Sequence, residues 1–382
     1  MRFPERLDSK LENRAKTSSL RSLILSRNKI DFASNDYLGI ALNSELESIV
    51  LNECSKLGQY SSTGSRLLTG NFKLVEQLEN QLAVFHETEA ALVFNSGYDA
   101  NLGFLSCVPQ RGDIVLYDAL VHTSIREGLQ LGLAKSYSFK HNDLFDLEES
   151  IKRLKIKDPN AVFYIVTESV FSMDGDTPDL IQLVQLAKKY NCLVVLDEAH
   201  ATGVFGNSGC GKAQELGIQD KIFARIHTFG KALGSQGAAI VGSQKLKEYL
   251  FNFSRAFIYT TALPPYCILK TLRVYLFLEE DNNSISTLRK NIIFFKKELK
   301  RLDLQEFFIE SDSAIHCAII GGTLETKKIA ILLQQQGFDI RPILAPTVQI
   351  GKERLRFCIH SFNSFNQITQ LLEAFKEHQH GE

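Results

Sequence analysis

The sequence has no excess of charge of either sign and no long apolar run. Its 382 residues contain 43 Lys+Arg and 44 Asp+Glu, so the formal net charge is -1. This balance excludes a chain-wide basic surface for nucleic acid or an anionic membrane. No apolar run approaches the roughly 20 residues of a membrane span, and the charged stretch after Met1 has no apolar signal core. We therefore expect a soluble cytoplasmic protein that binds neither nucleic acid nor membrane.

Paired cysteines and metal-ligand spacings are also absent. None of the seven cysteines stands in a C-x-x-C pair, and Cys192 lies inside an apolar run. An odd, unclustered set is typical of free thiols in a reducing compartment, and not of a disulfide frame or a zinc site. His378 and His380 lie in a polar tail, and the other histidines show no ligand spacing. We therefore expect no metal.

Helical patterns alternate with short apolar runs through the central part of the chain. From about Lys73 to Phe85 the apolar residues Leu74, Leu78, Leu82 and Phe85 recur at helical spacing, and an apolar run at 91–94 follows them. Further runs predict strands at 113–117, 161–166, 192–197, 225–229 and 238–242, and helical patterns fall at 121–132, 143–155 and 179–190. Strands that are apolar on both faces and alternate with helices indicate an α/β fold with a mostly parallel central sheet covered by helices.

The C-terminal part has a different pattern. A long helical stretch follows residues 263–265 and runs to about residue 302, with a polar break near 281–284. Strands are then predicted at 314–320 and 354–360, and helices at 325–336 and 365–378. This order indicates a smaller α+β domain. We predict an N-terminal segment at 1–45, a large α/β domain at 46–280 and a C-terminal α+β domain at 281–382.

Two motifs suggest a nucleotide-binding protein. Residues 197–200 spell the DEAH of a helicase, and residues 206–212 fit the G-x-x-x-x-G-K of a P-loop. However, Ala213 replaces the Ser/Thr that binds Mg²⁺, the glycine run follows the DEAH motif, and no strand leads into it. No strand opens a helix through G-x-G-x-x-G either, which disfavours a dinucleotide site. We interpret the glycine run as a loop.

A lysine in a glycine-flanked turn is the best candidate for catalysis. Lys231 stands between the strands predicted at 225–229 and 238–242, with Gly230 and Gly234 beside it. A desolvated amine in such a turn can form a Schiff base. A surface lysine in a β-turn is the alternative reading. Asp197 at a strand end, with His200 three residues later, favours a cofactor site.

Pyridoxal 5′-phosphate needs groups that this sequence supplies. A lysine binds its aldehyde, a carboxylate against the pyridine nitrogen makes the ring a better electron sink, and a helix N-terminus holds its phosphate. Residues 95–101, Asn-Ser-Gly-Tyr-Asp-Ala-Asn, predict a strand, a turn and a helix start. His122 follows the strand at 113–117, where an imidazole can stack on the ring. Asp197 and Lys231 are 231 − 197 = 34 residues apart, which leaves room for a crossover and the next strand.

With these motifs the sequence resembles the α-oxoamine synthases, a branch of the fold-type I pyridoxal-phosphate-dependent enzymes. The resemblance extends from Leu11 to about His360. It rests on a series of motifs in order: Ser34-Asn35-Asp36-Tyr37-Leu38-Gly39, Gly64-Ser65-Arg66-Leu67, Asn95-Ser96-Gly97-Tyr98, Thr167-Glu168 with Phe171-Ser172-Met173-Asp174-Gly175, Asp197-Glu198-Ala199-His200-Ala201-Thr202-Gly203, Thr228-Phe229-Gly230-Lys231, and Pro346-Thr347-Val348 with Arg354-Leu355-Arg356.

The resemblance implies a role for each matching residue in cofactor binding. Lys231 would bind the cofactor covalently and move protons, Asp197 would pair with the ring nitrogen, and His122 would stack on the ring. His200 and Ser172 would bond the phenolic oxygen. The phosphate end would be held by Ser96, Gly97, Tyr98 and Thr228. Family enzymes are homodimers with the site at the subunit interface, so Thr261 would serve the neighbour's phosphate.

The resemblance also implies an amino acid and an acyl thioester as substrates, which are joined with loss of CO₂. Arg356 matches the arginine that binds the amino-acid carboxylate, and the other substrate-binding positions are Arg21, Asn35, Arg341 and Thr347. The pattern is most similar to the branch that uses L-alanine and a pimeloyl thioester, carried by coenzyme A or acyl carrier protein, in biotin synthesis. That branch usually has glycine at the positions of Thr63 and Ser169, so a branch using serine or glycine with another acyl group remains the alternative. A non-enzymatic relative is disfavoured by the presence of both Lys231 and Asp197.

Overall fold

The computed structural model describes residues 3–23, 28–280 and 283–379, and these form two compact units. One unit contains Asp36–Ser172 and Thr177–Ser286, and the other contains Met1–Asn35, Met173–Asp176 and Thr287–Glu382. The boundary predicted at 280/281 adjoins residues outside the described ranges, and His380 itself lies outside them. The three-part division of the chain therefore stays a prediction.

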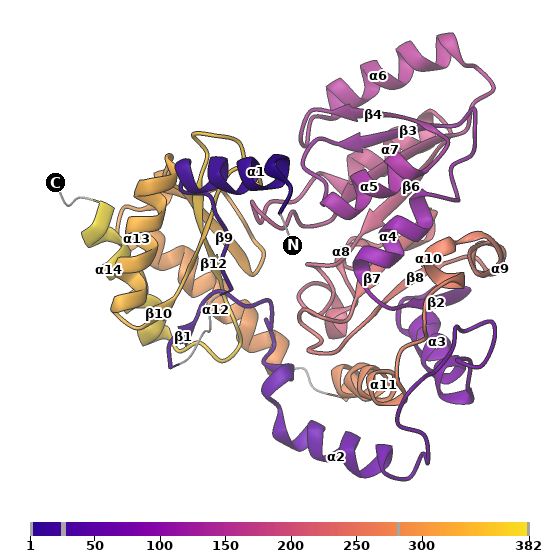
Figure 1. The fold of residues 1–382 in the computed structure, drawn as a ribbon, viewed down its shortest axis with the longest axis horizontal. Helices are drawn as coiled ribbons and strands as arrows, with labels where there is room; N and C mark the ends of the chain where they lie inside the picture. Colours follow the sequence, from indigo (N-terminus) through magenta and orange to yellow (C-terminus); the bar gives the residue numbers. More distant parts are fainter. Residues whose placement is uncertain (1–2, 24–27, 281–282, 380–382) are drawn as a thin grey trace. The chain divides into compact units, whose positions relative to one another are not determined.

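The larger unit is built on a seven-stranded sheet of order β2-β8-β7-β6-β5-β3-β4 (Figure 1). Its strands are β2 (Ala90–Phe94), β3 (Ile114–Asp118), β4 (Lys135–Phe139), β5 (Phe163–Glu168), β6 (Cys192–Asp197), β7 (Ala224–Thr228) and β8 (Ala238–Gly242). β8 runs antiparallel to both its neighbours, and the other pairs are parallel. The pattern missed β4, because this edge strand has exposed polar residues instead of an apolar run.

Helices cover both faces of this sheet, as the sequence predicts. Val195 faces one apolar cluster, which includes residues of α4 (Gly97–Leu105), α5 (Thr123–Leu131), α9 (Gln244–Phe253) and α10 (Arg255–Ile258). Its neighbours Val194 and Leu196 face a second cluster, with α6 (Leu144–Lys157), α7 (Leu180–Lys189) and α8 (Lys212–Glu215). Each such side chain stabilises the fold by about 1.5–3 kcal/mol when fully buried. This burial fixes the strand ends that carry polar residues.

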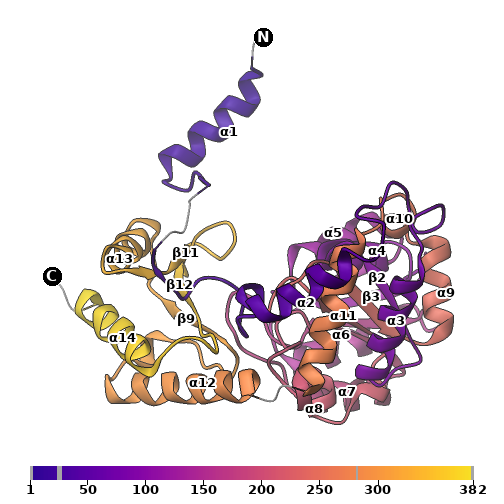
Figure 2. The ribbon, with the colours of Figure 1, turned by 90° about the horizontal axis from the view of Figure 1, so that it is seen from below.

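A further group of helices packs in the same unit. α11 (Pro265–Glu280) contacts both α2 (Ser44–Cys54) and α3 (Lys73–Phe85), as Figure 2 shows. Leu269 of α11 packs on Val50 and Cys54 of α2. Short 3₁₀ turns at Ile40–Leu42, Asn207–Gly209 and Gln219–Lys221 complete the connections.

The glycine run that resembles a P-loop is a loop, as predicted. It forms the 3₁₀ turn at Asn207–Gly209 and leads into the short helix α8. The buried carboxylate of Glu198 accepts the backbone N–H groups of Lys212 and Ala213 at 2.9 and 2.8 Å. The Glu of the DEAH sequence therefore caps α8.

The smaller unit is an α+β structure with two short sheets. β11 (Arg341–Ile343), β12 (Arg354–Cys358) and β9 (Ile315–Ile319) form an antiparallel sheet, and β1 (Ile30–Asp31) pairs in parallel with β10 (Phe338–Asp339). Its helices are α1 (Glu5–Lys16), α12 (Asn283–Arg301), α13 (Thr323–Gln335) and α14 (Phe365–Gln379), with a 3₁₀ turn at Gln305–Phe307. None of the described helices combines the length and the apolar character that a membrane crossing requires.

Candidate active site

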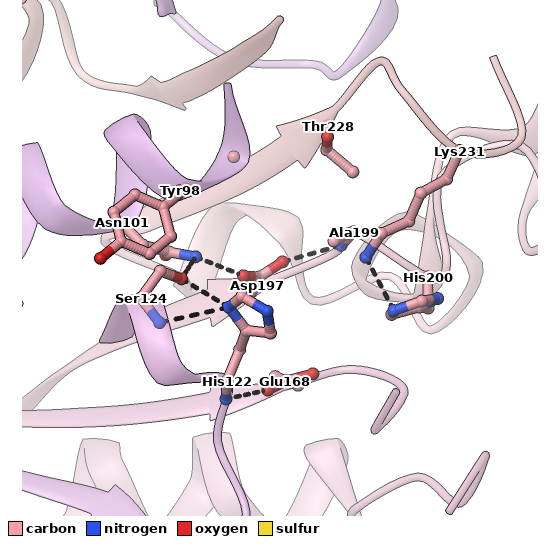
Figure 3. A pocket seen from close by; sticks show the side chains of 11 residues that line it. Tyr98, Asn101, His122, Ser124, Glu168, Asp197, Ala199, His200, Thr228 and Lys231 are labelled. Atoms are coloured by element: carbon pink, nitrogen blue, oxygen red, sulfur yellow. Dashed lines mark hydrogen bonds between the residues drawn. The ribbon is translucent and has the colours of Figure 1, made fainter. Parts of the chain in front are cut away.

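A cavity of about 150 Å³ lies where three neighbouring strands of the large sheet end. Glu168, Asp197 and Thr228 are the last residues of β5, β6 and β7, and all three line it. The carboxyl ends of parallel strands are where ligands bind in open α/β sheets. Figure 3 shows the lining, which consists of Gly97, Tyr98, Asn101, His122, Ser124, Glu168, Asp197, Ala199, His200, Thr228 and Lys231.

Lys231 lies in a tight turn between β7 and β8. Within this turn the backbone N–H of Gly234 donates to Lys231 O at 2.9 Å, and that of Ser235 donates to Phe229 O at 2.8 Å. Gly234 has φ +52°, and a Cβ atom there would lie 2.5 Å from the backbone nitrogen of Ala41. Only glycine fits this position without strain. The backbone thus holds the lysine at the cavity.

The amine of Lys231 is the end of a chain of polar side chains. Its Nζ lies 2.7 Å from Nε2 of His200, and Nδ1 of His200 lies 2.8 Å from the hydroxyl of Tyr37. Both His200 and Tyr37 are buried. An imidazole in contact with the amine can accept a proton from it or return one, because each ring nitrogen can either donate or accept a hydrogen bond.

Asp197 is a buried carboxylate held from two sides. Its Oδ1 accepts the backbone N–H of Ala199 at 2.8 Å, and its Oδ2 accepts an N–H of the Asn101 side chain at 2.7 Å. A carboxylate has about four acceptor sites, so these two bonds leave capacity for a further donor. This arrangement suits a protonated ring nitrogen.

Two helices begin at the cavity. Gly97 and Tyr98 are the first residues of α4, whose N-cap is Ser96, and His122 is the N-cap of α5. A Cβ atom on Gly97 would contact Thr228 at 3.4 Å, so the helix start closely approaches the end of β7. The free N–H groups and the dipole of a helix N-terminus attract phosphate.

Glu168 is a second carboxyl group at the site, in register with Asp197 across β5 and β6. It is buried, and its Oε1 accepts the backbone N–H of His122 at 2.5 Å. Burial raises the pKa of Glu168 to about 8, and the nearby charge of Asp197 acts in the same direction. Burial lowers the pKa of the His122 imidazole. Both groups are therefore neutral near pH 7.

These residues fit pyridoxal 5′-phosphate. The cavity offers an amine, a buried carboxylate with spare acceptor capacity and a helix N-terminus, and each of these matches a different part of that molecule. Sequence comparison adds an independent result. The model of the aminotransferase class I and II family matches residues 27–375.

The chain belongs to this family. It is 37% identical to the 8-amino-7-oxononanoate synthase of Emericella nidulans, with 92% of this chain and 89% of that protein covered. It is 38% identical to the enzyme of the same name from Lysinibacillus sphaericus, with 91% and 87% covered.

Solved structures of two related enzymes share the fold of this chain. The serine palmitoyltransferase of Sphingomonas wittichii has a TM-score of 0.90 and 26% identity, with 99% of this chain and 98% of that chain covered. The 8-amino-7-oxononanoate synthase of Francisella tularensis has a TM-score of 0.77 and 30% identity, with 91% and 97% covered. The predicted resemblance to the α-oxoamine synthases, the fold-type I architecture and the cofactor are thus confirmed, and the chain is a pyridoxal-phosphate-dependent acyltransferase.

The structure brings most of the residues predicted to bind this cofactor into the cavity: Gly97, Tyr98, His122, Asp197, His200, Thr228 and Lys231. Ser96, Ser172 and Thr261 are not among the lining residues. Ser96 caps α4, and its Oγ accepts the backbone N–H of Asp99 at 3.0 Å. The carbonyl oxygen of Thr261, an exposed residue, accepts a side-chain N–H of Asn95 at 2.7 Å. The cofactor roles of all these residues stay predictions.

The residues predicted to bind substrate lie in the smaller unit, where the structure groups them in pairs. Nη2 of Arg356 donates to Oδ1 of Asn35 at 2.9 Å, and Nη2 of Arg21 donates to Oγ1 of Thr347 at 3.4 Å. Arg341 faces Arg356 across β11 and β12, and its Nε lies 2.7 Å from Oδ1 of Asp339.

Four residues with polar side chains at the site had no predicted role: Tyr37, Asn101, Ser124 and Glu168. Glu168 was missed because the predicted strand ended at residue 166, whereas β5 continues to Glu168. Tyr37 and Asn101 stand inside quoted motifs, but their hydrogen bonds join segments that are distant in sequence. A search for polar residues at the true strand ends would have found Glu168.

Proposed function

We propose that this enzyme condenses L-alanine with a pimeloyl thioester to give 8-amino-7-oxononanoate, CO₂ and a free thiol, a step of biotin synthesis. The observation that supports this proposal most is the 37–38% identity to 8-amino-7-oxononanoate synthases over 91–92% of the chain. The thioester carrier would be coenzyme A or acyl carrier protein.

A specific observation favours a second candidate. Two serine palmitoyltransferase structures superpose with TM-scores of 0.89 and 0.90, whereas the 8-amino-7-oxononanoate synthase of Francisella tularensis gives 0.77. Global superposition reports the arrangement of the fold and not the shape of a substrate site. We therefore retain a sister synthase that uses serine or glycine with another acyl thioester as the alternative.

The proposed chemistry divides between the cofactor and the chain. When bound, pyridoxal 5′-phosphate supplies an aldehyde for the amino group and an electron sink for a carbanion at the α-carbon. Lys231 Nζ would attach the cofactor and, once released, remove the α-proton of the amino acid. His200, 2.7 Å from that amine, would hold the amine in place and exchange protons with it.

The carboxylate of Asp197 would keep a proton on the ring nitrogen. Its two bonds, from Asn101 and Ala199, fix the carboxylate orientation before the cofactor binds. His122 would pack on the ring face. The first turn of α4, with Ser96, Gly97 and Tyr98, and Thr228 would bind the phosphate.

The arginines of the smaller unit would bind the two carboxylate-bearing substrates. Arg356 carries a planar fork that forms two parallel bonds with a carboxylate, and Asn35 holds this fork at 2.9 Å. Arg21 or Arg341 would bind the distal carboxylate of the pimeloyl group. Arg341 has the carboxylate of Asp339 beside it, whereas Arg21 hydrogen-bonds the neutral hydroxyl of Thr347. We therefore favour Arg21.

The proposal includes a homodimer in the cytoplasm. The homodimer rests on the family resemblance. In this dimer Thr261 would bind the phosphate of the neighbour's cofactor. Ser172 would hydrogen-bond the phenolic oxygen of the cofactor. The cytoplasmic location rests on the scattered cysteines, all seven of which are free thiols. No nucleic acid is proposed as a partner, because the net charge is -1.

The test is a comparison of substrate pairs with purified enzyme. Alanine with pimeloyl thioester should give the highest kcat/KM. Glycine should follow at roughly 10–200-fold lower efficiency, because a single methyl group discriminates by that factor. Arg21→Gln should reduce the rate with pimeloyl thioester more than the rate with an uncharged acyl group of similar length. Faster turnover of serine with a long uncharged acyl thioester would select the sister synthase.

The covalent attachment has its own test. The visible band of the bound cofactor stands clear of the protein absorbance, because amino-acid side chains absorb only in the ultraviolet. Borohydride should fix the cofactor to the wild-type chain and not to Lys231→Ala, whereas the exposed-lysine control Lys221→Ala should behave like wild type. Covalent fixation in Lys231→Ala would exclude Lys231 as the attachment point.

A further inference from the structure

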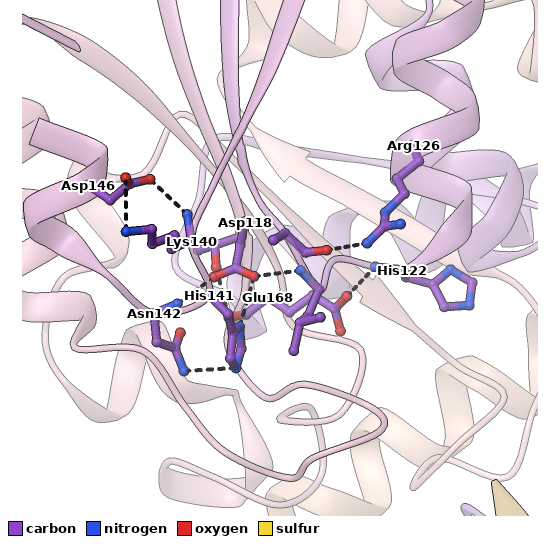
Figure 4. Close-up of polar contacts among 11 residues, drawn as sticks. Asp118, His122, Arg126, Lys140, His141, Asn142, Asp146 and Glu168 are labelled. Carbon is purple, nitrogen blue, oxygen red and sulfur yellow. Dashed lines mark hydrogen bonds and ion pairs between the residues drawn. The ribbon is translucent and has the colours of Figure 1, made fainter. Parts of the chain in front are cut away.

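Glu168 and Asp118 fix the backbone around His122. Figure 4 shows the loop between β3 and α5, where the backbone N–H of His122 donates to Glu168. Asp118 joins this loop to the loop between β4 and α6, since its Oδ1 accepts the N–H of Leu120 and its Oδ2 accepts the N–H of Asn142, each at 2.8 Å. The main chain at His122 is therefore set independently of its ring.

The ring of His122 is held by Ser124, which Asn101 connects to Asp197. Oγ of Ser124 lies 2.7 Å from Nδ1 of His122, and the backbone N–H of Ser124 donates to the same atom at 3.2 Å. The side-chain nitrogen of Asn101 lies 3.1 Å from Oγ of Ser124 and 2.7 Å from Oδ2 of Asp197. Asn101, Ser124 and Asp197 are all buried.

The direction of each hydrogen bond follows from the donor inventory. The amide nitrogen of Asn101 can only donate, and it has two hydrogens, one for Asp197 and one for Ser124. The reversed amide would set its oxygen against the Asp197 carboxylate, which is also an acceptor. Since the hydroxyl oxygen of Ser124 accepts from Asn101, its single hydrogen is available to Nδ1 of His122. A ring nitrogen that accepts hydrogen bonds carries no proton.

We infer that Asn101 and Ser124 are positioning residues that hold His122 as a neutral imidazole with its proton on Nε2, and that Asn101 links this ring to Asp197. That this network prepares the His122 ring to contact the cofactor rests on the proposed function. A neutral ring can stack on a pyridine ring that Asp197 keeps protonated, whereas an imidazolium would set a second positive charge against it.

The charged groups around the ring act in both directions. Burial lowers the pKa of His122, the carboxylate of Asp197 on β6 opposes this shift, and the ammonium of Lys231 in the β7–β8 turn supports it. Glu168 on β5 also lies at the loop, and burial raises its pKa to about 8. A donor on Nδ1 from Ser124 adds a preference for the neutral ring, since protonation of Nδ1 would remove that bond.

The test is nuclear magnetic resonance of the full chain without cofactor. Histidine labelled with ¹³C and ¹⁵N in the ring is introduced, and His122→Gln assigns the His122 signal among the nine histidines. At pH 7 we expect the shifts of a neutral ring protonated at Nε2. Ser124→Ala should raise the pKa of His122 by about half to one unit, the value of one lost hydrogen bond, and Ser124→Thr should restore it.

Two further variants sharpen this test. Asn101→Asp should raise the pKa of His122 further, because a carboxylate accepts the Ser124 hydrogen and adds negative charge. Ser136→Ala on the exposed face of β4 is the matched control and should change nothing.

Two results would overturn the inference: a proton on Nδ1 or a charged ring at pH 7 in the unmodified chain, or an unchanged pKa in Ser124→Ala. The first measurement is made on the unmodified chain and uses only His122→Gln, for assignment, so it decides the question even if a Ser124 or Asn101 variant fails to fold. The spectra are recorded without cofactor. A chain that shows the expected tautomer and binds no pyridoxal 5′-phosphate would therefore contradict the proposed function alone.

Discussion

At the scale of single residues, the site contains two neighbouring carboxyl groups that differ in their hydrogen bonds. Glu168 and Asp197 are in register at the ends of neighbouring strands. Asp197 receives N–H bonds from Asn101 and Ala199, whereas Glu168 receives one from the His122 backbone. Burial raises the pKa of Glu168 to about 8. The pair therefore offers one carboxylate to the cofactor and one neutral carboxyl to the chain.

Replacement of the cofactor-facing carboxylate should separate binding from catalysis. Asp197→Asn keeps the side-chain shape but cannot favour a protonated ring nitrogen, so kcat should fall at least roughly 100-fold while the cofactor still binds. Absorbance titration measures binding and steady-state kinetics measures turnover. Asp220→Asn, in an exposed 3₁₀ turn, is the control. Turnover close to wild type would remove Asp197 from the mechanism.

The neutral carboxyl should affect the pH dependence of stability. The pKa of Glu168 is about 8 in the folded chain, against an ordinary value of 4.5, so between these values the folded state retains a proton that the unfolded state has lost. The free energy of unfolding therefore falls as pH rises through this window, by on the order of 1 kcal/mol per pH unit for one proton.

In Glu168→Gln the side chain cannot ionise, so the free energy of unfolding of the cofactor-free protein should depend less steeply on pH. Urea unfolding at several pH values between 5.5 and 8.5 measures it. Glu149→Gln changes an exposed glutamate and should leave the slope as it is. Equal slopes in wild type and Glu168→Gln would show that Glu168 does not hold a proton in this range.

The carboxylate-binding arginine should be sensitive to a conservative change. Arg356→Lys replaces a planar fork with a single ammonium, which cannot form two parallel bonds to a carboxylate. We expect the KM for the amino acid to rise at least roughly tenfold, with the affinity for the cofactor unchanged. Steady-state kinetics and absorbance titration measure the two quantities. An unchanged KM would show that Arg356 does not bind the amino acid.

At the scale of elements, the β7–β8 turn sets the position of Lys231, and its shape depends on glycine. Gly234→Ala would introduce a Cβ atom 2.5 Å from Ala41 N at φ +52°. Gly217 is a matched control, because its φ is +64° and a Cβ atom there meets nothing within 4 Å. Gly217→Ala should therefore lower the free energy of unfolding only by the cost of a left-handed backbone conformation, about 1–2 kcal/mol.

We therefore expect Gly234→Ala to lower Tm more than Gly217→Ala and also to weaken cofactor binding, since the turn that carries Lys231 must move. Thermal unfolding and absorbance titration measure the two effects. Equal losses in both variants would mean that the close approach at Ala41 does not constrain the turn.

At the scale of the whole molecule, the proposed site needs a second copy of the chain. Light scattering after size exclusion should give twice 43.0 kDa, about 86 kDa. Thr261→Ala should weaken cofactor binding in this dimer, because its hydroxyl is proposed to serve the neighbour's phosphate. An active monomer of 43.0 kDa would contradict both the dimer and the shared site.

Strongly periodic segments were predictable from the sequence. α3 at Lys73–Phe85 and β6 at Cys192–Asp197 have the predicted bounds, because their apolar spacing matches one structural period over the whole element. β4 was not predicted, since an edge strand needs no apolar face. β1, β10 and β11 were not predicted either, because two or three residues carry no periodic signal.

By itself the sequence determined the residue types at the site, because Lys231, Asp197, His200 and His122 stand at strand ends and turns that local patterns reveal. Only the tertiary structure decided which side chains meet. Asn101 contacts Asp197 across 96 residues of chain, and Tyr37 contacts His200 across 163. Such contacts depend on the order of strands in the sheet, which brings together residues that no local pattern relates.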